Sequence, residues 1–269
     1  MRNIIKLHIT TIIFLFGVSS ARADFTFFHN HHTYLLISSG KKWDQAWTNA
    51  VSRGGTLARI DNATENNAIL TNLLNRGIST RAGDGGGSIY VWIGGKETVE
   101  GTYAWTAADG SPTTFWTNGS AGSAFDGLYV NFARNATSDG GPEPDNYAGI
   151  QNRAAMCLES WPNGSSTPIG VAGEWNDISS NNSLAHLVEF SPPTTPTNIT
   201  STVTDTNLTI NWPGNYIGWV LQMQTNSLAT GLLTDSNAWY NLSGTEITNS
   251  YSVPLLSAEG GMFFRLALP

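Results

Sequence analysis

Cysteine is almost absent from this chain, which has only Cys157 in 269 residues. A disulfide within the chain is therefore excluded, and since no His-Cys pattern accompanies it, Cys157 is interpreted as a buried, unreactive thiol. Charged residues are also scarce, at 12% of the chain, where about 25% is usual. Ten Trp and 40% hydrophobic residues can nevertheless bury a core, so the composition argues against disorder. It suits a secreted, β-rich protein.

Long apolar runs are limited to one, at residues 7–18, which two Thr and one His interrupt. It is shorter than the roughly 20 residues that span a bilayer. Basic residues precede it, and a small-residue cleavage motif follows at 21–23. We therefore predict a secretory signal peptide at residues 1–23 in preference to a membrane anchor. The mature protein is expected to be secreted, extracellular, periplasmic or on the cell surface, with no membrane insertion after cleavage.

Positive charge is scarce in the predicted mature chain, which has 10 basic and 20 acidic residues and a formal charge of −10. Such a surface disfavours nucleic acid and anionic membranes. It is compatible with a bound cation and with a neutral ligand. The expected partners are a glycan or a surface protein.

Two differently patterned regions flank the Pro/Thr-rich stretch 191–197, which is interpreted as a linker. Residues 24–190 combine two helical periodicities with several strand patterns and a long irregular stretch, whereas 198–269 shows short apolar segments every ten or so residues and no helix. The prediction is an α+β domain followed by a small all-β, sandwich-like domain. Helices are expected at 43–51 and after Asp61 or Asn62. The main strands are expected on both sides of the turn 29–32, at 57–60, 89–95, 103–105, 147–150, 156–158 and 184–190, and then at 199–203, 208–212, 219–225, 239–242, 251–255 and 262–268.

Two further features have simple interpretations. The Gly-rich loop 81–88 lacks the Lys-Ser/Thr of a phosphate-binding loop, so it is interpreted as a plain connection. His29, His31 and His32 suggest zinc, but no distant Cys/His set complements them. A polar turn is the favoured interpretation.

Two stretches about thirty residues apart carry the candidate chemistry. Glu143 and Asp145 flank a proline that stiffens their loop, while Asn176 and Asp177 directly follow Trp175, a large apolar anchor. Four hard oxygen ligands from two loops are what Ca²⁺ requires, with carbonyls and waters completing its shell.

These stretches resemble the EPN/QPD and WND motifs of C-type lectin-like domains. Further matches in the family's order are WDQA at 43–46, GGTLARI at 54–60, EN at 65–66, WIGG at 92–95, YAW at 103–105, DGS at 109–111 and VEF at 188–190. The family's half-cystine positions hold Ala50, Tyr147, Ser180 and Val188, as in disulfide-free members from secreted bacterial proteins. Residues 219–226 and 263–266 are similar to a C-terminal β module of such proteins, which implies no known activity.

The resemblance implies that Glu143, Asp145, Asn176 and Asp177 bind both Ca²⁺ and sugar hydroxyls. A second register is also open, because the family has a further Glu before its next strand. In that register Asp145 fills the later position, the EPN-like segment lies at 135–139, and Glu143 is not a ligand. Glu-Pro-Asp matches neither sugar-specificity motif, so the motif indicates no sugar preference. Phe132 and Trp161 are candidates for stacking on a sugar or, alternatively, for core packing.

Three functions come into question for this chain. The first is Ca²⁺-dependent carbohydrate binding, and the alternative is a calcium-independent protein-binding or adhesion module on the same fold. Glycoside hydrolysis requires two carboxylates across a cleft. Glu143 and Asp145 lie in one short loop, so the chain is not expected to be an enzyme.

Overall fold

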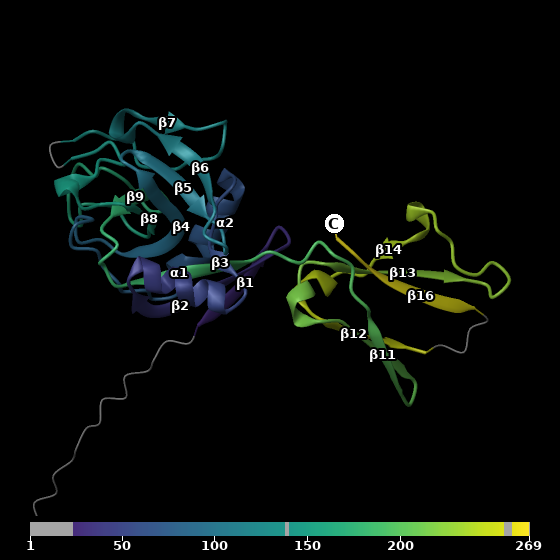
Figure 1. The fold of residues 1–269 in the computed structure, drawn as a ribbon. Coiled ribbons are helices and arrows are strands. Elements are labelled where there is room, and N and C mark those ends of the chain that lie inside the picture. The colour runs from purple at the N-terminus through teal and green to yellow at the C-terminus, as the bar shows by residue number, and fades with distance from the viewer. Residues whose placement is uncertain (1–23, 138–139, 256–259, 269) are drawn as a thin grey trace, which may run out of the picture.

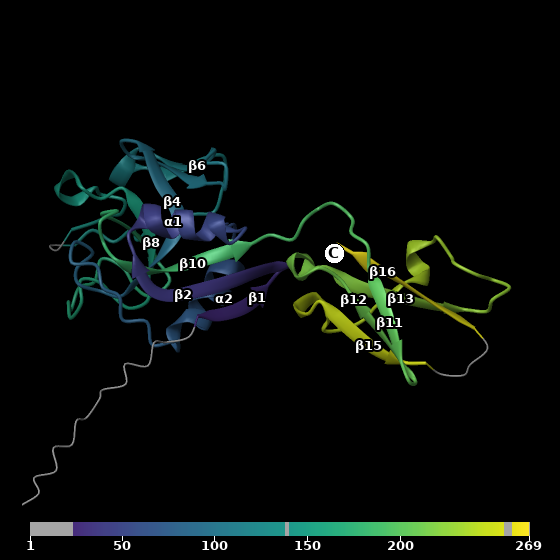
Figure 2. The same cartoon turned by 60° about the horizontal axis from the view of Figure 1, so that its bottom comes forward.

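The computed structural model describes residues 24–137, 140–255 and 260–268, and the predicted signal peptide lies outside them. The chain is α+β, with both helices and the largest sheet before residue 191 and two small sheets after residue 199 (Figure 1). One connecting segment leads from the last strand of the N-terminal part, residues 24–190, to the first strand of the C-terminal part, residues 198–269 (Figure 2).

The helices and strands have the following bounds. The N-terminal part contains β1 (Phe25–His29), β2 (His32–Lys41), α1 (Trp43–Ser52), β3 (Thr56–Leu57), α2 (Ala63–Leu74), β4 (Tyr90–Val99), β5 (Thr102–Thr106), β6 (Pro112–Thr117), β7 (Ser123–Ala124), β8 (Arg153–Cys157), β9 (Trp175–Ile178) and β10 (Leu184–Phe190). The C-terminal part contains β11 (Thr200–Thr204), β12 (Asn207–Asn211), β13 (Val220–Asn226), β14 (Tyr240–Asn241), β15 (Ser250–Pro254) and β16 (Gly261–Ala267).

Both predicted helices form for the reasons that their sequences suggest. In α1 the residues Trp43, Ala46 and Ala50 are buried, which is the three-to-four-residue spacing of one helix face. Asn62, one of the two candidate caps, begins α2, and its side chain accepts a hydrogen bond from the Glu65 N–H at 2.9 Å.

One strand prediction is wrong. Residues 147–150 form an exposed turn, with 3₁₀ geometry over Tyr147–Gly149, and Ala148 has φ of 58°. The mixture of Tyr, Ala, Gly and Ile resembles a strand in composition, but the burial that defines the strand begins only at Arg153 in β8.

The large sheet holds β9 in place through its pairing with the buried strand β8. Its main path runs β1-β2-β10-β4-β5-β6-β7, and β8 joins β4 on one side and β9 on the other. The β8–β9 register pairs Ala154 with Asp177 and Ala155 with Asn176. The two polar side chains of β9 are therefore fixed by a strand that is itself buried throughout.

Aromatic side chains dominate the core of the N-terminal part. Trp175 is fully buried, and its ring makes T-shaped contacts with Trp105, Phe115 and Phe132. Its indole N–H donates to the Asn66 side-chain oxygen at 2.9 Å, so its polar atom is satisfied. Burial of Cys157 agrees with its interpretation as a structural thiol.

The C-terminal part has its own buried cluster between two three-stranded sheets, ordered β11-β12-β15 and β14-β13-β16. The predicted linker lies against this part. The indole N–H of Trp219 donates to the Pro193 carbonyl at 2.8 Å, and the Tyr216 hydroxyl donates to the Thr195 carbonyl at 2.9 Å.

We predict that limited proteolysis cleaves the chain between Ser191 and Thr197. Residues 194–196 are exposed, and the buried clusters on the two sides share no residue. Digestion of the mature chain with a broad-specificity protease, followed by mass spectrometry, should yield a folded 24–190 fragment. A single unfolding transition with no stable fragment would contradict the predicted boundary.

Candidate functional site

The two predicted stretches lie next to each other, and Asp177 connects them. Its carboxylate is fully buried, with Oδ1 accepting the Asp145 N–H at 3.1 Å and Oδ2 accepting the Asn146 N–H at 3.0 Å. The Tyr103 hydroxyl also donates to Oδ2, at 3.0 Å. Asp177 therefore fixes the loop that carries Glu143 and Asp145 against the end of β9.

Three carboxyl groups meet at this point. One oxygen from each of Glu143, Asp145 and Asp177 lies within 4.8 Å of the other two. Glu143 is only 3% exposed, and its Oε2 has no hydrogen-bond partner among the described residues. A buried carboxylate oxygen without a donor is costly unless a proton or a cation supplies the missing interaction.

Asn176 contributes a second unpartnered oxygen. Its amide N–H donates to the Tyr90 hydroxyl at 3.1 Å, while its Oδ1 is buried and has no partner among the residues described. The side chain lines the same pocket as Glu143 and Asp145.

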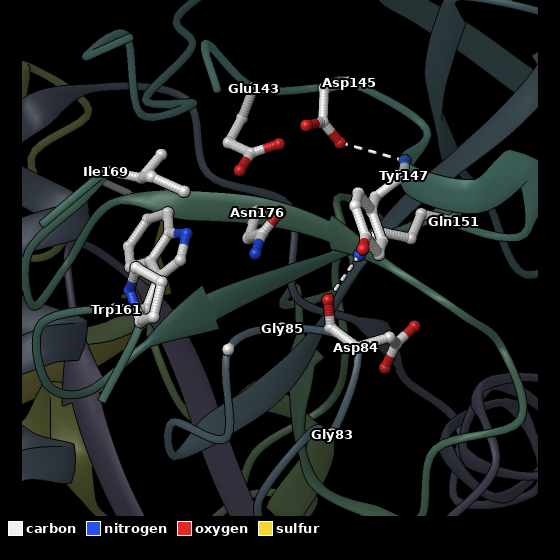
Figure 3. Close-up of a pocket in the computed structure, with 12 residues that line it drawn as sticks. Gly83, Asp84, Gly85, Glu143, Asp145, Tyr147, Gln151, Trp161, Ile169 and Asn176 are labelled. Atoms are coloured by element: carbon white, nitrogen blue, oxygen red, sulfur yellow. Dashed lines mark hydrogen bonds between the residues drawn. The ribbon is translucent and has the colours of Figure 1, made fainter. Parts of the chain in front are cut away.

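The pocket measures about 240 Å³. Glu143 and Asp145 lie along one side of it, and the loop that carries Asp84 lies along the opposite side (Figure 3). Trp161 forms one flank and Tyr147 the other (Figure 3). The full lining is Gly83, Asp84, Gly85, Gly86, Glu143, Asp145, Tyr147, Gln151, Trp161, Pro162, Ile169 and Asn176.

The Gly-rich loop is more than the plain connection that its sequence suggested. The Asp84 carboxylate accepts the Ser179 N–H at 2.7 Å, and its carbonyl accepts the Gln151 side-chain amide at 2.8 Å. Gly86 has φ of +67°, and a Cβ there would lie 2.7 Å from the Cα of Pro162. The glycines let this loop pack closely enough to form one wall of the pocket.

The electrostatics of the pocket follow from crowding and burial. Burial, together with the nearby charges of Asp177 and Asp145, raises the pKa of Glu143 to about 9. Burial also raises the pKa of Asp177. Without a cation, a proton on Glu143 therefore relieves the repulsion at neutral pH. An acidic, oxygen-only set with two unpartnered oxygens fits a hard cation such as Ca²⁺.

The structure shows which of the other sequence candidates line the pocket and which do not. Phe132 is buried within the aromatic core and does not line the pocket, so packing explains it. Trp161 is also buried but does line the pocket. At the histidine turn, His32 pairs with Glu189, and the described residues contain no zinc-type cluster there. Glu143 lies beside Asp177, as the first register expects, and Asn135 of the second register is exposed. Residues 138–139, which also belong to the second register, lie outside the described residues.

Sequence reasoning missed Asp84, Gln151 and Tyr147 as pocket residues. Gln151 is almost fully buried, and its side chain accepts the Tyr147 N–H at 2.9 Å while donating to Asp84. Its neighbours lie four and 67 positions away in the sequence, so no local pattern marks it.

The chain is similar in fold to C-type lectin domains. The solved structures that resemble it include the C-type lectin CEL-I from Cucumaria echinata, with 20% identity over 61% of this chain and 93% of that chain, at a TM-score of 0.40. The cow CD23 carbohydrate-recognition domain has 18% identity over 62% of this chain and 94% of its own, at a TM-score of 0.41. A calcium-independent type II antifreeze protein has 20% identity over 64% of this chain and 98% of its own, at a TM-score of 0.39.

No protein-family model matches the chain, and neither does any curated protein sequence. Within the described ranges, none of the helices has the length and apolar character that a membrane crossing requires.

Proposed function

We propose that this chain is a secreted carbohydrate-binding protein of the C-type lectin kind, with Ca²⁺ held in the pocket. Glu143, Asp145 and Asn176 would supply the accessible oxygens, and Asp177 would add its Oδ1. The observation that carries the proposal is the pair of buried, unpartnered oxygens, Glu143 Oε2 and Asn176 Oδ1, on one pocket beside two further carboxylates.

The roles of the residues differ within this set. Asp177 already accepts three hydrogen bonds, so it chiefly holds the loop in place. Oδ1 of Asp145 accepts the Tyr147 N–H at 2.9 Å, which orients its carboxylate along the rim. Glu143 and Asn176 would then face the cation. Bound Ca²⁺ would supply open coordination positions, since it takes six to eight oxygens and the protein offers about four.

A neutral, polyhydroxyl ligand suits these open positions. The pocket lining contains carboxylates and no Lys or Arg, so it offers nothing to an anionic ligand. Trp161 and Tyr147 add apolar flanks of the kind that the C–H face of a sugar ring packs on.

A calcium-independent, protein-binding function is the second candidate, and one feature favours it. Next to the pocket, Tyr147 is 63% exposed and Ile150 is 50% exposed. Large exposed apolar side chains are typical of protein-interaction surfaces. In this case the proton on Glu143, and no metal, would complete the carboxyl cluster.

Calorimetry with Ca²⁺ tests the first candidate. We expect a dissociation constant on the order of 10⁻⁴–10⁻³ M, as in extracellular calcium modules. Asp145→Asn should weaken binding at least about tenfold, since a neutral amide replaces a ligand carboxylate. Asp109→Asn is a matched control, because Asp109 likewise accepts a backbone N–H two residues ahead, at 2.9 Å, but is exposed and does not line the pocket.

A glycan array probed with and without EDTA provides the second measurement. Binding that EDTA abolishes would support the proposal. No heat with millimolar Ca²⁺, together with EDTA-insensitive binding to a protein, would favour the second candidate.

A further inference from the structure

Arg134 makes an unusual set of contacts beside the pocket without lining it. One terminal nitrogen of its guanidinium, Nη1, donates to the Glu143 carbonyl at 2.5 Å, and the other, Nη2, donates to the Ser120 carbonyl at 2.8 Å. The guanidinium carbon lies 5.1 Å from the centre of the Trp116 ring. A planar, permanently charged fork suits this geometry, because it can bind two carbonyls while resting on an aromatic ring.

The contact with Glu143 completes a backbone clamp. The Glu143 N–H donates to the Ala133 carbonyl at 2.8 Å, so consecutive residues, Ala133 and Arg134, hold both polar groups of the Glu143 backbone. Two residues further on, the Asp145 N–H is held by Asp177. The 143–145 loop is thus held at Glu143 by Ala133 and Arg134 and at Asp145 by Asp177.

This clamp matters because the Glu143 side chain has little else to hold it. Its Oε2 has no partner among the described residues, and the carboxylates of Asp145 and Asp177 repel it whenever it is ionised, as it is when a cation is bound. The backbone must therefore keep the carboxyl group in the pocket. The Ser120 carbonyl anchors the clamp in turn to the 3₁₀ turn Gly119–Ala121, which follows β6.

We infer that Arg134 is a positioning residue for the pocket, which sets the place of the Glu143 carboxyl group by clamping its carbonyl to the turn 119–121. The consequence for Ca²⁺ binding rests on the proposed function, whereas the clamp itself does not. Arg134 acts through Glu143 and need not touch the ligand.

Charge and position predict opposite effects when Arg134 is replaced. Its positive charge is held at the Glu143 backbone, so a purely electrostatic role predicts that removing the charge strengthens cation binding. A positioning role predicts weaker binding, because Glu143 loses one of its two backbone anchors. The sign of the change therefore separates the two roles.

The test compares Arg134→Met with Arg76→Met in the full mature chain. Met keeps an apolar stem for the aromatic ring and removes the guanidinium. Arg76 is a matched control, since it is an exposed arginine that does not line the pocket. Its guanidinium carbon lies 3.2 Å from the centre of the Phe25 ring, and its Nε donates to the Asn72 carbonyl at 3.1 Å. Arg134→Lys retains the charge but not the planar two-carbonyl fork.

Two measurements are made on each variant, once its melting temperature has been shown to equal that of the wild type. Hydrogen exchange in EDTA should show faster exchange of the Glu143 and Asp145 amides in Arg134→Met and no change in Arg76→Met. Calorimetry should show Ca²⁺ binding about tenfold weaker in Arg134→Met, an intermediate loss in Arg134→Lys and none in Arg76→Met. Unchanged amide exchange, or tighter Ca²⁺ binding, in Arg134→Met would overturn the inference. If the wild-type chain gives no heat with Ca²⁺, the proposed function fails, and the exchange measurement still decides the clamp.

Discussion

Trp175→Ala should destabilise the N-terminal part by about 3–5 kcal/mol, the usual range for truncating a buried Trp. The side chain is fully buried and lies among Trp105, Phe115 and Phe132, so no water can fill the space that it leaves without contacting apolar surface. The substitution also leaves the buried side-chain oxygen of Asn66 without the hydrogen bond that it accepts from the indole N–H. Typical domain stabilities are about 5–15 kcal/mol, so this single change removes a large share.

Urea unfolding followed by circular dichroism measures the effect, and two variants make it interpretable. Trp175→Phe keeps an aromatic six-membered ring and removes only the pyrrole portion of the indole with its N–H, so its cost should be clearly smaller. Trp47→Ala removes the same side chain from α1, where it is only half-buried, and should cost much less. Equal losses for Trp175→Ala and Trp47→Ala would show that Trp175 does not organise the core.

This role for Trp175 was accessible from the sequence, and so was the juxtaposition of the two polar stretches. A bulky apolar residue directly before Asn176 and Asp177 predicts burial, and burial leaves little choice of direction to the two polar side chains. The helices were equally predictable, since the buried face of α1 is marked by the spacing of Trp43, Ala46 and Ala50. The burial of Trp175 and the helix faces depend on neighbours along the chain, whereas the juxtaposition of the two stretches was implied by the family resemblance.

The rest of the site depends on contacts between distant segments. Asp177 was expected to face a cation directly, but most of its hydrogen-bonding capacity holds the backbone of residues 145 and 146. That role is invisible in sequence, because a backbone N–H carries no residue identity. Asp84 escapes prediction from sequence for a related reason: its loop has no recognised ligand motif, and its glycines serve close packing against Pro162. The exposed turn at 147–149 was mistaken for a strand because composition alone does not reveal positive φ.

Glu143→Gln should have opposite effects on stability and on calcium. In EDTA at pH 7 we expect the free energy of unfolding to rise by an amount on the order of 2 kcal/mol, while Ca²⁺ binding is lost. The amide resembles the protonated carboxyl group, so it can donate to the neighbouring carboxylate without first taking up a proton. Calcium binding fails because a neutral amide replaces a charged ligand in a set of only about four.

The pH dependence of this gain follows from linkage. The folded state raises the pKa of Glu143 from 4.5 to about 9, so between these values the folded protein holds a proton that the unfolded chain releases. Wild-type stability contributed by this group is therefore fully present below pH 4.5 and declines as pH rises towards 9. Each pH unit corresponds to about 1.4 kcal/mol, and partial relaxation of the cluster reduces the total. The variant lacks this decline, so its advantage should be near zero at pH 4.5 and should grow with pH.

Denaturant unfolding in EDTA at pH 4.5, 6, 7 and 8, on the wild type and Glu143→Gln, measures this advantage directly. Glu246→Gln makes the same chemical change in the C-terminal part and should give curves parallel to the wild type. Saturating Ca²⁺ should then stabilise the wild type and leave Glu143→Gln unchanged, because only a chain that binds the ion gains from mass action. A destabilised Glu143→Gln variant that still binds Ca²⁺ would mean that Glu143 is a packing residue. A stabilised variant that no longer binds Ca²⁺ would show that the crowded carboxyl cluster destabilises the fold and that its function is to bind the cation.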